Sequence, residues 1–233
     1  MSERPYIVLS CSMSIDGYLS GATDERLVLS NADDLDRVDA VRAGCDAILV
    51  GAATIRRDNP RLLIRSADRR AAREARGCPP SPVKVTMTSG AGLDPCADFF
   101  ATGDVEKIVY CSSAGLDDAV ARLGAVATIV DGGDPIDIGR LAKDLYSRGI
   151  ARLMVEGGGS VHTQFLTTGL ADELQLVVAP FFVGDRRARR FVGDGEFPWN
   201  PGTRARLAAV RQIGDVVLLR YALSPRCAAE GVS

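Results

Sequence analysis

Three consecutive glycines follow a carboxylate and a strand-like run in the second half of the chain. The stretch reads Leu153-Met154-Val155-Glu156-Gly157-Gly158-Gly159-Ser160 and leads into a helical pattern. Glycines without a Cβ let a phosphate approach the backbone, and a helix start offers unpaired N–H groups and the positive end of its dipole. A nucleotide pyrophosphate would fit this turn, although a triple glycine can equally be a tight connector. Glu156 adds weight because α/β sheets place ligands at the carboxyl ends of their strands.

A second candidate group follows the apolar run Ala47-Ile48-Leu49-Val50. Thr54 and Asp58 come soon after it, and Asn59-Pro60 forces an extended or turn conformation that re-aims the chain. We expect Thr54 and Asp58 to lie over the strand ends, with a plain turn residue as the alternative for Asp58. Asp16-Gly17, after the first apolar run, is expected to be a turn.

The elements that would position these groups alternate along the chain. Strand-like runs occupy residues 6–9, 47–50, 83–87, 108–110, 125–130 and 153–155. Continuous runs of this kind are typical of strands buried on both faces of a mostly parallel sheet. Gly214-Asp215 separates two further runs and predicts a C-terminal antiparallel hairpin. The sequence therefore predicts an α/β fold, a mostly parallel central sheet flanked by helices, in a single domain over residues 1–233.

Helical patterns lie between the runs. Asn31 can cap a helix with Leu35, Val38 and Val41 as its apolar positions and a stop at Gly44. Two more helices are expected around residues 116–123 and 138–145. The arginine-rich run 69–76 is expected to be a solvated helix or excursion.

Charge and composition exclude several classes of protein. The 233 residues carry 28 Lys and Arg against 30 Asp and Glu, so no overall field would hold the chain on nucleic acid or an anionic membrane. No apolar run approaches the roughly 20 residues that span a bilayer, and the first residues lack a signal-peptide pattern. We expect a cytoplasmic protein without nucleic-acid or membrane partners.

Cysteine and histidine usage predicts no metal site. The six cysteines form no Cys-x-x-Cys pair, and one histidine is too few to complete a site with them. We expect Cys11, Cys45 and Cys111 to be small buried hydrophobes. His162 lies just after the glycines, so we expect it at the surface or a pocket rim rather than in catalysis.

Five motifs occur in the order of one known family. They are Met13-Ser14-Ile15-Asp16-Gly17; Val41-Arg42-Ala43 with Asp46-Ala47-Ile48-Leu49-Val50-Gly51; Thr54-Ile55 with Asp58-Asn59-Pro60-Arg61-Leu62; Glu156-Gly157-Gly158-Gly159; and Gly169-Leu170-Ala171-Asp172-Glu173 with Ala179-Pro180. Together they resemble the reductase domain of riboflavin biosynthesis, the C-terminal half of a bifunctional deaminase/reductase, whose fold is like dihydrofolate reductase. The similarity covers nearly the whole chain.

The resemblance implies an NADPH-dependent 5-amino-6-(5-phosphoribosylamino)uracil reductase that converts a ribosyl group to ribityl, usually as a homodimer. Its cofactor-binding residues would be Ser12, Thr54, Asp58, Ser89, Gly157, Gly158, Gly159 and Ser160. The residues facing a small phosphorylated heterocycle would be Arg42, Leu62, Arg65 and Glu156, with Asp58 and Glu156 as the catalytic residues. Hydride transfer needs no protein nucleophile, only a nicotinamide and a substrate carbon held about 3–3.5 Å apart.

Several positions depart from the family pattern. Arg26 and Val28 stand where relatives carry a serine and an aromatic residue, and Asp39 stands where a histidine is usual. The zinc motifs of the deaminase half are absent. Gly90-Ala91-Gly92 offers no arginine for a 2′-phosphate, so NADPH rather than NADH is implied by the resemblance alone. Two alternatives stay open: a dihydrofolate reductase-like enzyme on another pterin, pyrimidine or secondary metabolite, and a non-catalytic nucleotide-binding protein.

Overall fold

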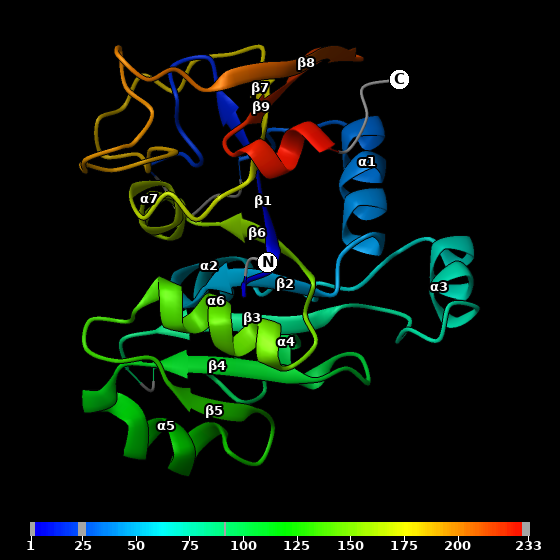
Figure 1. The fold of residues 1–233 in the computed structure, drawn as a ribbon, viewed down its shortest axis with the longest axis vertical. Coiled ribbons are helices and arrows are strands. Elements are labelled where there is room, and N and C mark those ends of the chain that lie inside the picture. The colour runs from blue at the N-terminus through cyan, green and yellow to red at the C-terminus, as the bar shows by residue number, and fades with distance from the viewer. Residues whose placement is uncertain (1–2, 23–26, 91, 230–233) are drawn as a thin grey trace. The chain divides into compact units, whose positions relative to one another are not determined.

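Apolar runs form the strands of this protein, and the polar segments between them form helices and loops. The computed structural model describes residues 3–22, 27–90 and 92–229 (Figure 1). Two units divide the chain: unit 1 holds the described parts of Met1–Pro5 and Asp39–Met154, and unit 2 those of Tyr6–Val38 and Val155–Ser233. Helix α1 (Ala32–Ala43) and strand β6 (Arg152–Gly157) each contribute residues to both units.

Unit 1 is built on a parallel sheet. Its strands β2 (Ala47–Gly51), β3 (Val83–Thr88), β4 (Lys107–Cys111) and β5 (Thr128–Asp131) lie in the order β5-β4-β3-β2. The register pairs Leu49 with Val85 and Val85 with Ile108, and all three side chains are fully buried. Because β2, β3 and β4 are buried along most of their length, their sequences are continuous apolar runs rather than alternating patterns.

The helices of unit 1 follow the strands. They are α2 (Ala52–Asp58), α3 (Ala67–Glu74), α4 (Asp98–Ala101), α5 (Leu116–Leu123) and α6 (Ile138–Ser147), with a short helix η1 (Ser113–Gly115). Helix α6 buries Ile138, Leu141 and Leu145, as their spacing predicts. The hydroxyl of Tyr110 in β4 donates a 2.6 Å hydrogen bond to Asp144 of α6 and so connects this helix to the sheet.

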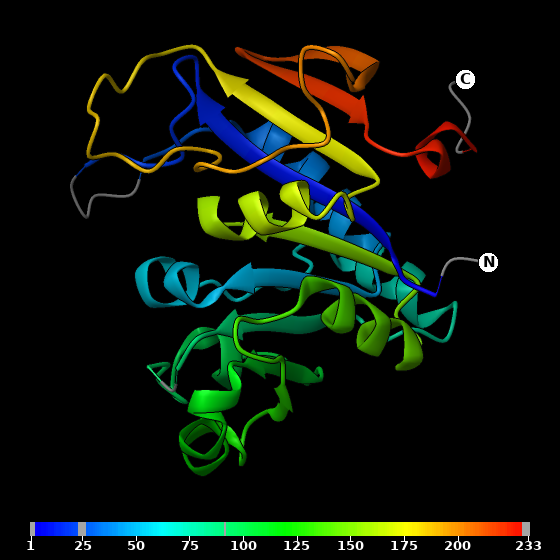
Figure 2. The ribbon, with the colours of Figure 1, turned by 60° about the vertical axis from the view of Figure 1, so that its left-hand side comes forward.

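Unit 2 combines parallel and antiparallel strands (Figure 2). Its strands β1 (Tyr6–Ser14), β7 (Glu173–Ala179), β8 (Arg206–Ile213) and β9 (Val216–Ala222) lie in the order β1-β7-β9-β8. β1 and β7 are parallel, whereas β9 runs antiparallel to both β7 and β8. Gly214 has φ 60° at the hairpin turn, as a two-residue loop requires. Helices α7 (Gly159–Thr167) and η2 (Pro225–Ala229) complete the unit.

These elements confirm the predicted α/β class, with its parallel strands and antiparallel C-terminal hairpin. Strand β7 was not among the predicted runs, and β5 begins three residues later than expected. Among the described residues, no helix has the length and apolar character needed to cross a bilayer.

Helix α1 departs from the predicted pattern of burial. Asn31 caps it, because its side chain accepts a 2.9 Å hydrogen bond from the N–H of Asp34. The side chain of Leu35, however, is 40% exposed, while Asp34 and Asp39 are buried. The prediction was therefore wrong for Leu35, whereas Val38 and Val41 are half-buried, and hydrogen-bonded carboxylates take inward positions beside them.

The arginine-rich helix α3 is also not simply solvated. Arg73 is buried, and its guanidinium donates to the carbonyl oxygens of Pro79, Ala43 and Cys45 at 2.8, 2.9 and 2.8 Å. A guanidinium carries five N–H donors in a rigid fork, which suits it to several carbonyls at once. Arg73 thus joins the segment after α3 to the chain between α1 and β2.

We predict that Arg73→Met lowers the free energy of unfolding by about 2–4 kcal/mol, because three carbonyls, that of buried Cys45 among them, lose a charged donor. Arg76→Met is the matched control, since Arg76 is exposed, and its effect should stay within about 0.5 kcal/mol. Urea unfolding followed by circular dichroism measures both. Equal unfolding free energies for the two variants would contradict a structural role for Arg73.

Candidate functional site

The carboxyl ends of β2 and β3 lie at one edge of the parallel sheet of unit 1. Helix α2 begins directly after β2 and carries Thr54, which is half-buried, and Ser89 follows β3 and is exposed. The structure thus places both predicted residues at the edge where α/β sheets receive ligands.

Asp58 is the last residue of α2 and is paired with its neighbour. The guanidinium of Arg57 donates to both of its carboxylate oxygens, at 2.7 and 2.9 Å. The hydrogen bond to Asp58 raises the pKa of Arg57 above its usual value. Asn59 ends the helix in a left-handed conformation with φ 40°, and its side-chain oxygen accepts from the N–H of Asp98 at 2.7 Å.

The loop of residues 62–66 follows α2. Leu62 adopts φ 51°, a conformation that is uncommon for a bulky residue and that occurs most often where surrounding contacts impose it. The side chains of Leu62 and Ile64 are buried, whereas that of Arg65 is 56% exposed. The buried side chains of Leu62 and Ile64 anchor the loop. Arg65, which follows Ile64, has its side chain at the surface.

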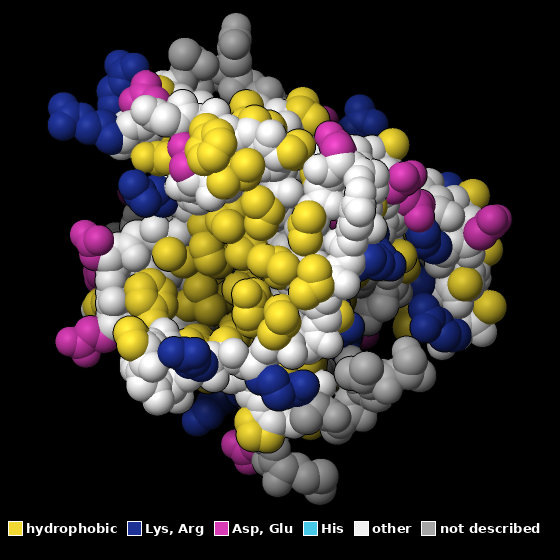
Figure 3. Space-filling view, turned by 90° about the horizontal axis from the view of Figure 1, so that it is seen from above, with side chains coloured by type: hydrophobic (Ala, Val, Ile, Leu, Met, Phe, Trp, Pro, Cys, Tyr) yellow, Lys and Arg dark blue, Asp and Glu magenta, His cyan; other side chains and the backbone are white. Residues whose placement is uncertain are grey.

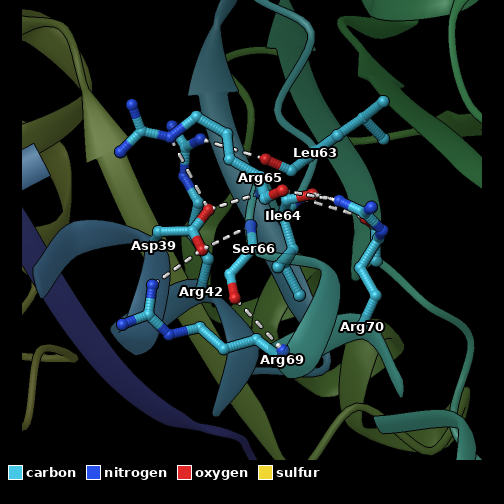
Figure 4. Close-up of polar contacts among 9 residues, drawn as sticks. Asp39, Arg42, Leu63, Ile64, Arg65, Ser66, Arg69 and Arg70 are labelled. Atoms are coloured by element: carbon cyan, nitrogen blue, oxygen red, sulfur yellow. Dashed lines mark hydrogen bonds and ion pairs between the residues drawn. The ribbon is translucent and has the colours of Figure 1, made fainter. Parts of the chain in front are cut away.

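Side chains from other elements hold the backbone of this loop (Figure 4). Asp39 of α1 accepts from the N–H groups of Arg65 and Ser66, at 2.6 and 3.2 Å, and from the Arg69 guanidinium at 3.0 Å. Arg42, one turn further along α1, donates to the carbonyl of Leu63 at 3.5 Å. The predicted substrate-facing residues Arg42, Leu62 and Arg65 are therefore brought together in unit 1.

Asp39 is a residue to which the sequence assigned no role. Its pKa is lowered although burial acts to raise it, because the N–H of Arg65, the Arg69 guanidinium and the N–H of Ser66 favour the ionised form. One signal could have identified it: Asp39 lies three residues before Arg42, and this spacing puts both on one face of a helix.

The glycine turn in unit 2 has a conformation that only glycine adopts readily. Gly157 has φ 108°, and Gly158 has φ 78° with ψ 152°. Helix α7 starts at Gly159, and no side chain caps its first N–H groups. Backbone N–H groups at an uncapped helix start are suited to receive a phosphate.

His162 is not at the surface, so that expectation was wrong. Its side chain is fully buried, and among the described residues neither ring nitrogen has a hydrogen-bond partner. A Cβ added to Gly157 would come within 2.5 Å of its Nε2. Burial lowers the pKa of His162 to about 4. The spacing of His162 and Leu166 could have revealed this, because i and i+4 lie on one helix face and Leu166 is buried.

Other predicted residues occupy less enclosed positions. Glu156 is half-buried at the end of β6, Ser160 is exposed in the first turn of α7, and Ser12 is half-buried in β1 opposite Val177. Arg26 lies outside the described residues, and Val28 is exposed. The part of the chain that the structure describes contains no group of three or more His, Cys, Asp or Glu residues able to hold a metal.

The turn after β1 is bonded to the segment that follows β7. Gly17 has φ 86°, which confirms the predicted turn, and Asp16 accepts from the N–H groups of Val183 and Gly184 at 3.1 and 2.8 Å. These bonds and one from Ser14 outweigh desolvation and lower the pKa of Asp16 to about 2.

Comparison with known protein families shows which family the chain belongs to. The model of the RibD C-terminal domain matches residues 5–219. The chain belongs to the RibD C-terminal domain family. It is 32% identical over 213 residues to a 2,5-diamino-6-ribosylamino-4(3H)-pyrimidinone 5′-phosphate reductase of Archaeoglobus fulgidus, covering 91% of this chain and 95% of that protein. A protein of the same name from Methanothermobacter thermautotrophicus is 34% identical over 221 residues, covering 94% of this chain and 98% of that protein.

A solved structure shows the same fold. The pyrimidine reductase-like protein of Corynebacterium diphtheriae superposes with a TM-score of 0.79 at 22% identity, covering 94% of this chain and 91% of that one. The RibD-type fold predicted from the ordered motifs is therefore confirmed.

We predict that burial of His162 makes the protein sensitive to mild acid. The folded pKa of about 4 lies below the ordinary 6.5, so the unfolded chain binds the proton more readily. Stability should fall as pH drops below about 6.5, and the loss should reach about 3 kcal/mol by about pH 4.

The control for this prediction is His162→Leu, which is close in volume and cannot titrate. Carboxylates titrate in both proteins, so the difference between their urea midpoints at each pH isolates the histidine. At neutral pH the free energy of unfolding of His162→Leu should match or exceed that of the wild type, because the substitution removes two ring nitrogens that have no hydrogen-bond partner among the described residues. Parallel pH curves for the two proteins would refute the assignment.

Proposed function

We propose that this protein is an NADPH-dependent reductase of a phosphorylated ribosylaminopyrimidine in riboflavin biosynthesis. The observation that carries the proposal is membership of the RibD C-terminal domain family, with two relatives above 30% identity that are named as such reductases. Their names favour the 2,5-diaminopyrimidinone as the first substrate to test, with 5-amino-6-(5-phosphoribosylamino)uracil as the second.

The glycine turn supports a dinucleotide cofactor. Gly157 and Gly158 have positive φ values that ordinary residues rarely adopt, and the start of α7, whose N-cap is Gly158, offers N–H groups to a pyrophosphate. We assign Gly157, Gly158, Gly159 and Ser160 to the phosphates, and Ser12, Thr54, Asp58 and Ser89 to the rest of the cofactor. When bound, NADPH supplies the hydride.

The proposed reaction, from a ribosyl to a ribityl group, opens a ribose ring. A hydride adds to C1′, the bond from C1′ to the ring oxygen breaks, and that oxygen takes up a proton. We propose that Glu156, half-buried at a strand end, orients the substrate and supplies this proton. Asp58 would have to break two hydrogen bonds with Arg57 to act as a donor, so its proposed role is to position the cofactor.

The decisive experiment measures NADPH consumption with both phosphorylated pyrimidines, and with dihydrofolate and NADH as comparisons. Turnover of a phosphorylated ribosylaminopyrimidine supports the proposal. Turnover of dihydrofolate alone would favour a dihydrofolate reductase-like enzyme, and NADPH binding without turnover would favour a nucleotide-binding protein.

We predict that Arg65→Met raises KM for the phosphorylated substrate by about ten- to a hundred-fold, because a charge-assisted bond to a phosphate contributes about 1.5–3 kcal/mol. KM for NADPH should stay the same. Arg61→Met is the matched control, since Arg61 is exposed on the same segment and makes only a 3.5 Å ion pair with Asp98. If the wild type had equal kcat and KM values for phosphorylated and dephosphorylated substrates, the proposal of a phosphorylated substrate would be wrong.

We further propose a homodimer formed through the outer face of the sheet of unit 2. The register aligns apolar side chains across the strands, as in the row Cys11, Leu176, Leu219 and Val210. Val210 is 58% exposed, and Val217, two residues before its partner Leu219 in β9, is 37% exposed. Figure 3 looks onto the region of β7, β8 and β9 and shows hydrophobic side chains gathered in a hollowed area. Exposed apolar surface of this kind is typical of protein interfaces.

Val210→Glu should therefore convert a dimer into a monomer, because it buries a charge in the interface. Val120→Glu, at a 51% exposed position on α5, is the control and should leave the dimer intact. Sedimentation velocity over a range of concentrations reports the mass. A monomeric wild type at high concentration would exclude this interface.

A further inference from the structure

Asp39 contacts the loop of residues 62–66 at the residue proposed to bind the substrate phosphate. Its carboxylate is 1% exposed, and Oδ1 accepts from the N–H of Arg65 while Oδ2 accepts from the N–H of Ser66. These are the two successive peptide groups that flank the Cα of Arg65. Because each peptide is planar, fixing both planes also fixes the direction in which the Arg65 side chain leaves the backbone.

The charge of Asp39 is balanced by a different arginine. Arg69 donates to Oδ2 at 3.0 Å, whereas the Nε of Arg65 lies 3.8 Å from Oδ1 and its side chain is 56% exposed. A buried carboxylate needs such a partner to offset its desolvation. Asp39 therefore meets Arg65 twice: it accepts from the backbone N–H at 2.6 Å, and it forms an ion pair with the guanidinium at 3.8 Å.

Further contacts make the loop stiff on its other side. Arg70 donates to the carbonyl oxygens of Ile64 and Arg65 at 2.9 and 2.7 Å, and the hydroxyl of Ser81 accepts from the N–H of Ile64 at 3.1 Å. Figure 4 shows Arg70 reaching the loop from α3 while Asp39 reaches it from α1, and it shows the Arg69 side chain extending to Asp39. The loop is thus held from both sides, and its geometry is set before any substrate arrives.

We propose that Asp39 is a positioning residue for substrate recognition: it orients Arg65 toward the phosphate of the substrate, and Arg69 balances the charge of the Asp39 carboxylate. This inference rests on the proposed function, and it adds a specificity role for two residues that do not themselves contact substrate. Preorganised groups bind more tightly because less ordering remains to be done on binding.

The test is a double-mutant cycle with Asp39→Asn and Arg65→Met. Asp39→Asn should raise KM for the phosphorylated substrate about ten-fold, while kcat and KM for NADPH change less than about two-fold. KM for the dephosphorylated substrate should not change. In the Arg65→Met background the same substitution should have no further effect on KM, because the group it positions is gone.

Two further variants separate positioning from stability. Asp46→Asn is the matched control: Asp46 also accepts two backbone N–H groups in unit 1, those of Ala151 and Arg152 at 2.9 and 2.8 Å. It should lower the melting temperature as Asp39→Asn does and leave KM unchanged. Arg69→Gln should raise KM for the phosphorylated substrate although Asp39 is intact.

A folded Asp39→Asn protein with the KM of the wild type would overturn the inference, as would an equal effect in the presence and absence of Arg65. Calorimetric binding of ribose 5-phosphate provides a measurement that does not depend on turnover. If the wild type reduces neither pyrimidine, the proposed function is wrong. Weaker binding of ribose 5-phosphate by Asp39→Asn than by the wild type would still support the positioning role of Asp39, and equal binding would contradict it. If Asp39→Asn does not fold, KM and ribose 5-phosphate binding are compared between Arg69→Gln and the wild type instead.

Discussion

Carboxylates that accept backbone N–H groups from distant segments determine where the loops of this protein lie. Asp39 holds residues 65–66, Asp46 holds residues 151–152, Asp16 holds residues 183–184, and Asp172 holds the N–H of Ile7 at 2.9 Å. Residues 65–66 and 183–184 lie in loops, whereas Arg152 and Ile7 lie in the first two residues of β6 and β1. A charged acceptor is worth more than a neutral one, and removing Asp39, Asp46 or Asp16 leaves two N–H groups unpaired at once.

This arrangement explains how an irregular segment can serve as part of a binding site. Leu62 keeps an unfavourable φ only because the buried side chains of Leu62 and Ile64 and the bonds from Asp39, Arg42 and Arg70 over-determine the loop. The backbone strain is confined to Leu62, and the side chains that hold the loop in this conformation come from α1 and α3. A loop held in this way presents Arg65 in one orientation, which is the property that recognition of a phosphate requires.

The sequence predicted those parts of the fold that hydrophobic patterning controls, and it failed where buried polar groups replace that pattern. The runs at 47–50, 83–87 and 108–110 became strands because continuous burial leaves a continuous apolar signal. Helix α1 buries Asp34 and Asp39 instead of Leu35, Arg73 enters the interior of unit 1, and His162 lies beneath the glycine turn. Hydropathy assigns all four residues to the surface. Hydrogen bonds make burial favourable for three of them: Asp39 and Arg73 have partners that are distant in sequence, and Asp34 is bonded by Ser30 and Arg37 nearby. His162 has no hydrogen-bond partner among the described residues.

The same contrast separates the two groups of candidate site residues. In unit 1 the loop near Arg65 depends on charge, so its geometry responds to substitutions that remove a carboxylate or a guanidinium while preserving shape. In unit 2 the turn at Gly157 and Gly158 depends on the absence of side chains, since Gly157 faces His162 and Gly159 faces the carbonyl of Arg190. Volume rather than charge is the constraint there, and a methyl group would suffice to displace the turn. A family that keeps its cofactor and varies its substrate can therefore change the first group residue by residue, whereas the second admits little besides glycine.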